Sequence, residues 1–251
     1  MSGHSKWHSI KHQKAATDAK RGQMFTKLTR EIIVAARNGG SSIDANYALR
    51  LAVQRAKDSS MPWDNINRAI QKASGGGEGA AMVEMVLEGY GPGGGAILVN
   101  ALSDNRNRTI QAVRNLFTRG GGSLGENGCV AWLFDSRGVI NVKAEGIDKD
   151  ELALKAIDFG AEDVNVEGDY VTIYTKPQKL EEVRAALEKE KIEIESAELS
   201  MIAKQTIDLE EKQSVQTMRL LENLEELDDV QKVASNVNFS DTALAAFEKA
   251  Q

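Results

Sequence analysis

The chain has 251 residues, 41% of them hydrophobic, and its 31 Lys and Arg against 37 Asp and Glu give a formal net charge of −6. This length predicts two or three domains with packed cores. A single cysteine, Cys129, excludes an internal disulfide framework and suits a reducing compartment. With no long apolar run and a polar start, we expect neither a membrane span nor a secretory signal.

Charge is unevenly distributed along the chain. Residues 1–79 contain 13 Lys and Arg against 6 Asp and Glu, a balance of +7 that leaves −13 for residues 80–251. His4, His8 and His12 also lie in the positive segment. A basic head on an acidic body is expected when one end of a protein meets a polyanion. The alternative is a solvated basic helix bundle without a partner.

Residues 13–38 show the period of an amphipathic helix. One apolar stripe about 100° wide would face a core; it comprises Phe25, Leu28, Ile32, Ala35 and Ala36. A separate arc is cationic; it comprises Lys20, Lys27, Arg30 and Arg37. We expect Gly39 and Gly40 to end the helix and Gly22 to separate an N-terminal arm from it. The helix can thus pack on its own bundle and present cations outward.

The basic head supplies most of the candidate nucleic-acid contacts. Its cations can reach phosphates, which position a protein without specifying sequence; the candidates are Lys6, Lys11, Lys14, Lys20, Arg21, Lys27, Arg30 and Arg37. Trp7 is a further candidate, either stacked on an unpaired base or anchored in the bundle core.

Residues 44–73 complete a first helical domain, with Leu49, Ala52, Val53 and Ala56 at core spacing. The glycines at 75–77 predict a linker. Two strands follow, around 83–87 and 96–102. Between them, residues 89–95 satisfy the spacing of a dinucleotide-binding GxGxxG motif. Because a strand rather than a helix follows, a plain strand connection is favoured over a cofactor site.

Ser103, Asp104 and Asn105 can cap a helix over about 106–118. One of its faces offers side chains that bond phosphates or base edges, or that simply meet water; it comprises Arg108, Gln111, Asn115 and Arg119. After a glycine-rich loop, residues 129–134 predict an apolar strand in which Cys129 is structural.

The clearest fold pattern is strand–helix–strand–strand–helix–strand between residues 138 and 201, the ferredoxin-like order. A further helix over about 211–228 and a strand at 233–238 follow. We therefore predict an α+β multi-domain fold in which a ferredoxin-like domain, 136–204, interrupts an α/β domain. The predicted domains are 1–79, a basic helical bundle, then 80–135 joined with 205–251, and the 136–204 insert.

Four stretches carry a resemblance to a known family. They are GHSKWHSIKHQKAATDAKRGQMFTKLTREI from residue 3, PWDNINRAI at 62–70, EGYGPGGG at 88–95 and RGGGSLGENGCVAWLF at 119–134. Together they resemble the YebC/PmpR family over essentially the whole chain; only His8 departs from the residues usual there. The resemblance implies a cytoplasmic regulator, described both as a DNA-binding transcriptional regulator and as a ribosome-associated translation factor relieving stalls at proline runs. Mitochondrial relatives activate translation of cytochrome oxidase.

Catalytic patterns are poor, and we expect neither an enzyme nor a cofactor. The three histidines would share one face if the arm were helical, but no carboxylate or thiol completes a metal site, so no metal is expected. The acidic residues near 222–229 are either a solvated face or a cover for the basic N-terminal arm when no nucleic acid is bound; they are Glu222, Glu225, Glu226, Asp228 and Asp229.

The sequence therefore predicts a nucleic-acid-binding, non-catalytic regulator, with a DNA-binding transcriptional regulator as the first hypothesis. A ribosome-associated translation factor is the alternative. The partner is duplex DNA or ribosomal RNA, and the sequence does not determine the oligomeric state.

Overall fold

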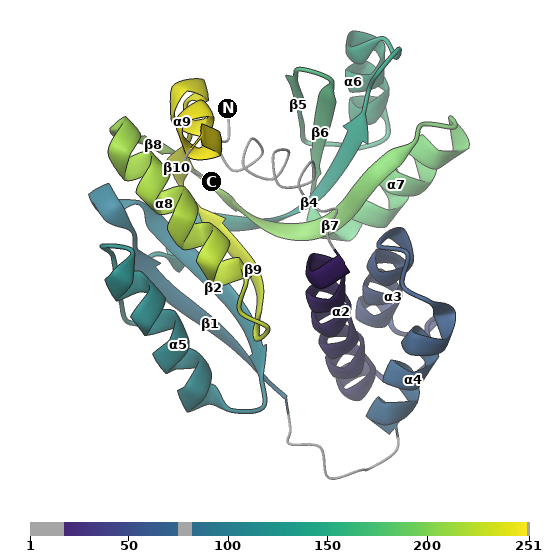
Figure 1. Cartoon of the computed structure of the whole chain (residues 1–251). Coiled ribbons are helices and arrows are strands. Elements are labelled where there is room, and N and C mark those ends of the chain that lie inside the picture. Colours follow the sequence, from purple (N-terminus) through teal and green to yellow (C-terminus); the bar gives the residue numbers. More distant parts are fainter. Residues whose placement is uncertain (1–17, 75–81, 250–251) are drawn as a thin grey trace. The chain divides into compact units, whose positions relative to one another are not determined.

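The structure is a computed structural model that describes residues 18–74 and 82–249 (Figure 1). It divides into two compact units: one is Asp135–Ile202, and the other holds the described residues before and after it. The predicted fold class is confirmed, since the chain combines N-terminal helices with antiparallel sheets. The three-domain division and its boundaries stay a prediction.

Three helices form the N-terminal part of the larger unit. They are α2 (Asp18–Gly39), α3 (Tyr47–Asp58) and α4 (Trp63–Ser74). The predicted stripe of α2 faces their common core, where Leu28, Ile32, Ala35 and Ala36 are buried and Phe25 packs against them. The expected break at Gly22 is wrong, because α2 continues through it. A glycine inside a helix costs only about 1 kcal/mol, which packing of the following turns offsets.

The end of α2 is tied to the start of α3 by one buried side chain. The Asn46 amide donates to the carbonyls of Ala35, at 2.7 Å, and Gly40, at 2.8 Å, while its oxygen accepts from the Leu49 amide. Gly40 has a φ of 88°, the left-handed conformation expected where the helix stops. These hydrogen bonds of Asn46 fix the angle between α2 and α3.

A four-stranded antiparallel sheet, in the order β3-β1-β2-β9, forms the rest of the larger unit. Its strands are β1 (Val83–Tyr90), β2 (Ala96–Ser103), β3 (Ser123–Leu124) and β9 (Val230–Ser235). Helices α5 (Arg106–Arg119) and α8 (Glu211–Glu225) share one apolar core with this sheet, and α9 (Asp241–Lys249) packs on α8 (Figure 1). Residues after 203 thus complete the sheet begun at Val83. The strand predicted at 233–238 is divided between β9 and the short β10 (Val237–Asn238). The sequence did not predict α9, β8 (Ile207–Asp208) or the parallel pairing of β8 with β10.

The glycine-rich segment between β1 and β2 is a strand connection, as predicted. It contains a short 3-10 turn, η1 (Pro92–Gly94), in which Gly93 and Gly94 have φ of 72° and 84°. Such angles favour glycine over any other residue. The segment enters β2 directly and opens no helix.

The predicted strand over residues 129–134 is wrong. This stretch is a loop with a 3-10 turn, η2 (Ala131–Leu133), and the strand begins only at Phe134. Its backbone amides point at the buried carboxylate of Glu88 on β1, which accepts from Gly128 at 2.6 Å, Val130 at 2.8 Å and Ala131 at 2.7 Å. Amides used in this way cannot serve a sheet ladder.

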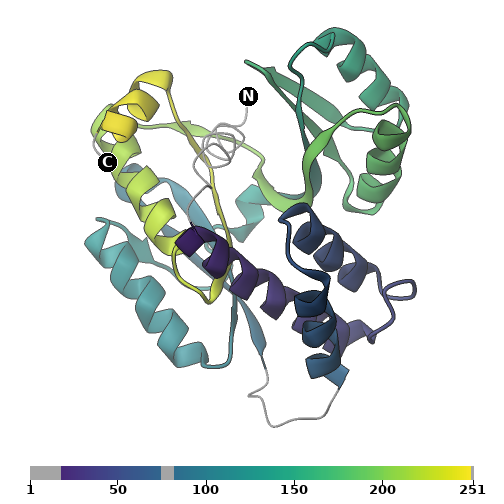
Figure 2. The ribbon, with the colours of Figure 1, turned by 45° about the vertical axis from the view of Figure 1, so that its right-hand side comes forward.

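The smaller unit has the predicted strand–helix–strand–strand–helix–strand order. Its strands form one sheet in the order β5-β6-β4-β7, and Figures 1 and 2 show α6 and α7 on one side of it. Its elements are β4 (Phe134–Lys143), α6 (Lys149–Asp158), β5 (Asp163–Glu167), β6 (Tyr170–Thr175), η3 (Pro177–Lys179), α7 (Leu180–Lys189) and β7 (Ile194–Ala203). Within the described ranges, no helix is both long and apolar enough to cross a bilayer.

Candidate nucleic-acid interface

The predicted contacts of the basic head fall into three groups. Lys6, Trp7, Lys11 and Lys14 lie outside the described residues, as do His4, His8 and His12. Lys20 lies in the first turn of α2, where only the backbone is described. Arg21 and Arg37 are exposed near the two ends of α2, whereas Lys27 and Arg30 are half-buried in its middle.

Lys27 contacts the last turn of α8, and Arg30 contacts the acidic turn that follows this helix. The Lys27 ammonium donates to the backbone carbonyl of Glu225, in the last turn of that helix. Arg30 donates to the carbonyl of Asp228 and to the carboxylate of Asp229, the latter at 2.7 Å. Both cations thus lie where the carbonyl end of a helix favours positive charge. Asp228 and Asp229 of the acidic cluster thus contact α2, while the cover of the N-terminal arm stays a prediction.

Asp229 joins these cations to α5. Its carboxylate accepts from Arg30, from Arg108 at 2.9 Å, from the hydroxyl of Thr109 at 2.6 Å and from Ser103 at 3.2 Å. Burial raises the pKa of Asp229, but the hydrogen bonds from Thr109 and Arg108 and the charges of Arg30 and Arg108 outweigh this and hold it below its ordinary value. Asp229 therefore stays ionised at neutral pH and forms ion pairs with two guanidinium groups, those of Arg30 and Arg108.

The outward face of α5 is as predicted. Arg108, Gln111, Asn115 and Arg119 are all exposed, while Val113 and Phe117 are fully buried beneath them. The Asn105 side chain caps the helix by accepting from the Arg108 amide. Arg108 is held by Asp104 and Asp229, yet 54% of its side chain is exposed. This face can present guanidinium and amide groups together to an anion.

The sequence analysis missed Arg106 and Arg114, which are also exposed on α5. The helix RNRTIQAVRNLFTR carries four arginines and no acidic residue. Counting charges over the whole helix, rather than over one face of it, would have found them. The accumulated positive charge makes α5 the most basic described helix outside the N-terminal segment.

No metal-binding arrangement accompanies these cations in the parts of the chain that the structure describes. No group of three or more His, Cys, Asp or Glu side chains there is placed to hold a metal ion. Burial and the nearby charge of Glu88 raise the pKa of the Cys129 thiol, which keeps it protonated and weakly nucleophilic.

Family models match most of the chain. The model of the TACO1/YebC N-terminal domain matches residues 5–76, and that of the TACO1/YebC second and third domain matches residues 82–237. The chain belongs to the TACO1/YebC family.

Individual relatives agree with this assignment. A probable transcriptional regulatory protein of Dehalococcoides mccartyi is 59% identical over 239 residues, 95% of each chain. Another, of Desulfosudis oleivorans, is 49% identical over 242 residues, which are 96% of this chain and 98% of that protein. The crystal structure of a conserved hypothetical protein from Aquifex aeolicus matches with a TM-score of 0.85 and 46% identity, covering 91% of this chain and 94% of that one.

Two further residues of this TACO1/YebC chain escaped the sequence analysis. Trp132 and Tyr90 are among the large apolar side chains left exposed, and they lie around the loop that Glu88 holds. Trp132 was assigned to an apolar strand, a setting that does not suggest an exposed side chain.

Proposed function

We propose that this chain is a non-catalytic, cytoplasmic regulator of transcription that binds duplex DNA through the outward face of α5 and the basic face of α2. The observation that carries the proposal is α5 itself, a helix with four arginines, no acidic residue and an exposed polar face. The names of the relatives, probable transcriptional regulatory proteins, support the regulatory part of the proposal.

The side chains on α5 suit two kinds of contact. Arg114 and Arg119 are exposed cations for phosphates, which fix the register of a protein on DNA. Gln111 and Asn115, also exposed on this helix, belong to the residue types that read adenine edges with two hydrogen bonds. A helix that carries both kinds can position itself on the backbone and distinguish bases.

Asp229 reduces the positive charge that α2 and α5 present to a polyanion. Its carboxylate occupies Arg30 and part of Arg108, so a phosphate approaching either guanidinium competes with it. The competition lowers non-specific affinity for any polyanion, and it leaves Arg114 and Arg119 as the first contacts. The predicted cover by acidic residues is proposed in this narrower form, with Asp229 as its main group.

A ribosome-associated translation factor is the second candidate, because RNA phosphates meet the same cations. The observation that favours it is the exposure of Trp132 and Tyr90, since unpaired bases are the usual targets of exposed aromatic rings. Duplex DNA offers no such bases.

The salt dependence of binding tests the proposal. We compare the wild type with Arg114→Ala/Arg119→Ala on one duplex DNA across a salt series. Loss of two phosphate contacts should flatten the log–log slope by about 1.8 units, at about 0.9 per contact. The matched control is Lys176→Ala/Lys189→Ala, which removes the same charge from exposed positions of the smaller unit. An α5 double variant with the wild-type slope would remove α5 from the interface.

A further inference from the structure

Two exposed aromatic side chains share one hydrogen-bond acceptor. The Tyr90 hydroxyl, at the end of β1, donates to the carbonyl of Cys129 at 3.0 Å, and the Trp132 indole nitrogen donates to the same oxygen at 3.2 Å. Trp132 is nevertheless 65% exposed and Tyr90 38% exposed. The polar ends of both side chains thus converge on one carbonyl oxygen, while the side chains themselves remain exposed.

Their hydrogen-bonding groups are already used within the chain. Trp132 has a single polar group, its indole N–H, and that group has its partner; the Tyr90 hydroxyl has one as well. The surface that remains toward solvent is therefore mostly ring. Aromatic faces are the part of such side chains that another flat, π-bonded group can contact.

The backbone beneath Trp132 is held on both sides. Before it, the amides of Gly128, Val130 and Ala131 bind the Glu88 carboxylate. After it, the Leu133 carbonyl accepts from the Lys204 amide at 2.8 Å. A ring carried on backbone fixed in this way loses little conformational freedom when it binds a partner.

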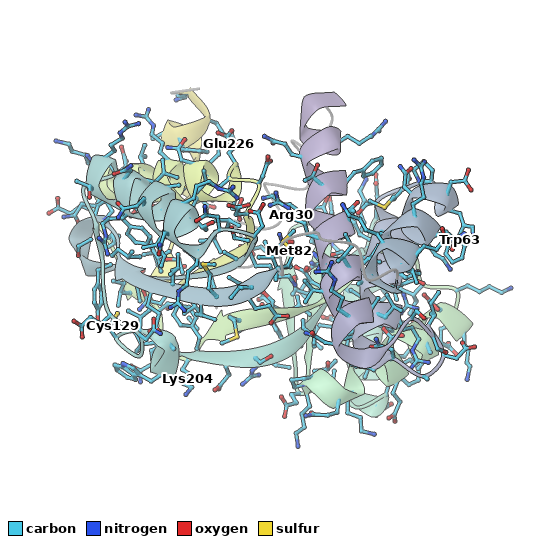
Figure 3. The ribbon with its side chains drawn as sticks, turned by 90° about the horizontal axis from the view of Figure 1, so that it is seen from below. Arg30, Trp63, Met82, Cys129, Lys204 and Glu226 are labelled. Carbon is cyan, nitrogen blue, oxygen red and sulfur yellow. The ribbon has the colours of Figure 1, made fainter. Side chains whose placement is uncertain are left out.

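Positive charge lies next to the aromatic pair. The ammonium of Lys204, an exposed residue, donates to the backbone carbonyl of Trp132 at 2.9 Å, so a cation lies at the backbone of the residue that carries the indole; Figure 3 shows Cys129 and Lys204 near the same edge. The turn that follows Arg119 also approaches, since a Cβ on Gly122 would lie 2.4 Å from the Tyr90 carbonyl. The basic α5 therefore ends close to the aromatic pair.

We propose that Tyr90 and Trp132 form a stacking platform for an unpaired base of single-stranded nucleic acid, with Lys204 meeting the adjoining phosphate. The combination of exposed rings and a cation is the one that single-strand-binding proteins use. This rests on the proposed function only in that the chain binds nucleic acid, and it adds a site for unpaired bases at one edge of that surface, the ligand expected for the second candidate. A duplex keeps its base faces stacked and does not use the platform.

The experiment measures binding of a short uridine-only RNA, the matching single-stranded DNA and a DNA duplex. The variants are Trp132→Ala, Trp132→Phe and Trp63→Ala. Trp63 is the matched control, because it is 47% exposed on α4 and also has a lysine beside it, with the Lys57 ammonium 5.1 Å from the ring centroid.

Trp132→Ala should weaken binding of both single strands about tenfold, the effect of losing one stacked base, and leave the duplex unchanged. Trp132→Phe should retain most of the affinity, and Trp63→Ala should bind as the wild type does. RNA and DNA single strands should respond alike, since every base offers a π-face.

Unchanged single-strand affinity in Trp132→Ala, with salt-dependent binding intact, would overturn the platform and leave the proposed function standing. An equal loss on duplex and single strand would also overturn it, because the ring would then serve binding in general or the fold. If the wild type binds none of the three nucleic acids, the platform and the proposed function both fall.

Discussion

Replacing Glu88 with Gln tests how the loop that carries Trp132 is held. Glu88 is only 4% exposed, and its two oxygens accept three backbone N–H groups, from Gly128, Val130 and Ala131. Burial raises the pKa of Glu88, but these three hydrogen bonds outweigh it and lower the pKa below its ordinary value. The carboxylate is therefore the charged acceptor around which residues 128–131 fold.

The expected loss of stability in Glu88→Gln follows from counting the acceptor atoms of the two side chains. Glutamine keeps the shape of the side chain but offers one carbonyl oxygen, so at least one of the three amides faces an NH₂ group instead. Hydrogen bonds to charged groups contribute about 1.5–3 kcal/mol and neutral ones about 1 kcal/mol. One lost bond and two weakened ones should together cost about 2–4 kcal/mol of stability in this part of the chain.

Urea unfolding and amide hydrogen exchange provide the assay. The matched control is Glu84→Gln, which makes the same change on the same face of β1 at an exposed position and should cost under about 0.5 kcal/mol. Glu88→Gln should speed exchange of the Gly128, Val130 and Ala131 amides, and Glu84→Gln should not.

Acid provides a second check on Glu88. Because its pKa is lowered by folding, the stability it contributes is present above the unfolded value, near about 4.3, and is lost as pH falls through the lower native value. The difference between the wild type and Glu88→Gln should therefore shrink below about pH 4. Equal stability of the two Gln variants at neutral pH, or a difference that does not shrink in acid, would refute the reasoning.

Two further predictions concern the basic helices. Asp229→Asn should lower the thermal midpoint of unfolding, yet raise affinity for duplex DNA several-fold at low salt, because Arg30 and Arg108 lose the carboxylate of Asp229. The control Glu226→Gln makes an equal charge change at an exposed position and should do neither. Unchanged affinity in Asp229→Asn would contradict the proposed competition. Gly22→Ala should stabilise the chain by about 0.5–1 kcal/mol in thermal unfolding, because residue 22 is helical and has open space around its Cα. A destabilised variant would show that the glycine is needed at this position.

Local periodicity carried much of the fold prediction. The stripe from Leu28 to Ala36 and the buried Val113 and Phe117 follow from helical spacing alone, because each helix buries one face. The ferredoxin-like strand order was equally predictable from alternating segments of strand and helix period. The candidate face of α5 was found for the same reason.

Contacts between distant segments explain what was missed. The stretch from Cys129 to Phe134 is apolar enough for a strand, but Glu88, about 40 residues earlier, takes its amides. The pairing of Arg30 with Asp229 joins residues 199 positions apart, so no local pattern indicates it. Trp132 was overlooked because an apolar run suggests burial, whereas its loop keeps it at the surface.

The most direct test of the central claim is photo-crosslinking in living cells from position 111, the exposed Gln in the middle of α5. A photoreactive residue there should attach to chromosomal DNA, and the same photoreactive residue in place of Ala185, exposed on α7, should attach to little or none. Recovery of ribosomal RNA without DNA would contradict a role in transcription, and recovery of no nucleic acid from position 111 would contradict the interface itself.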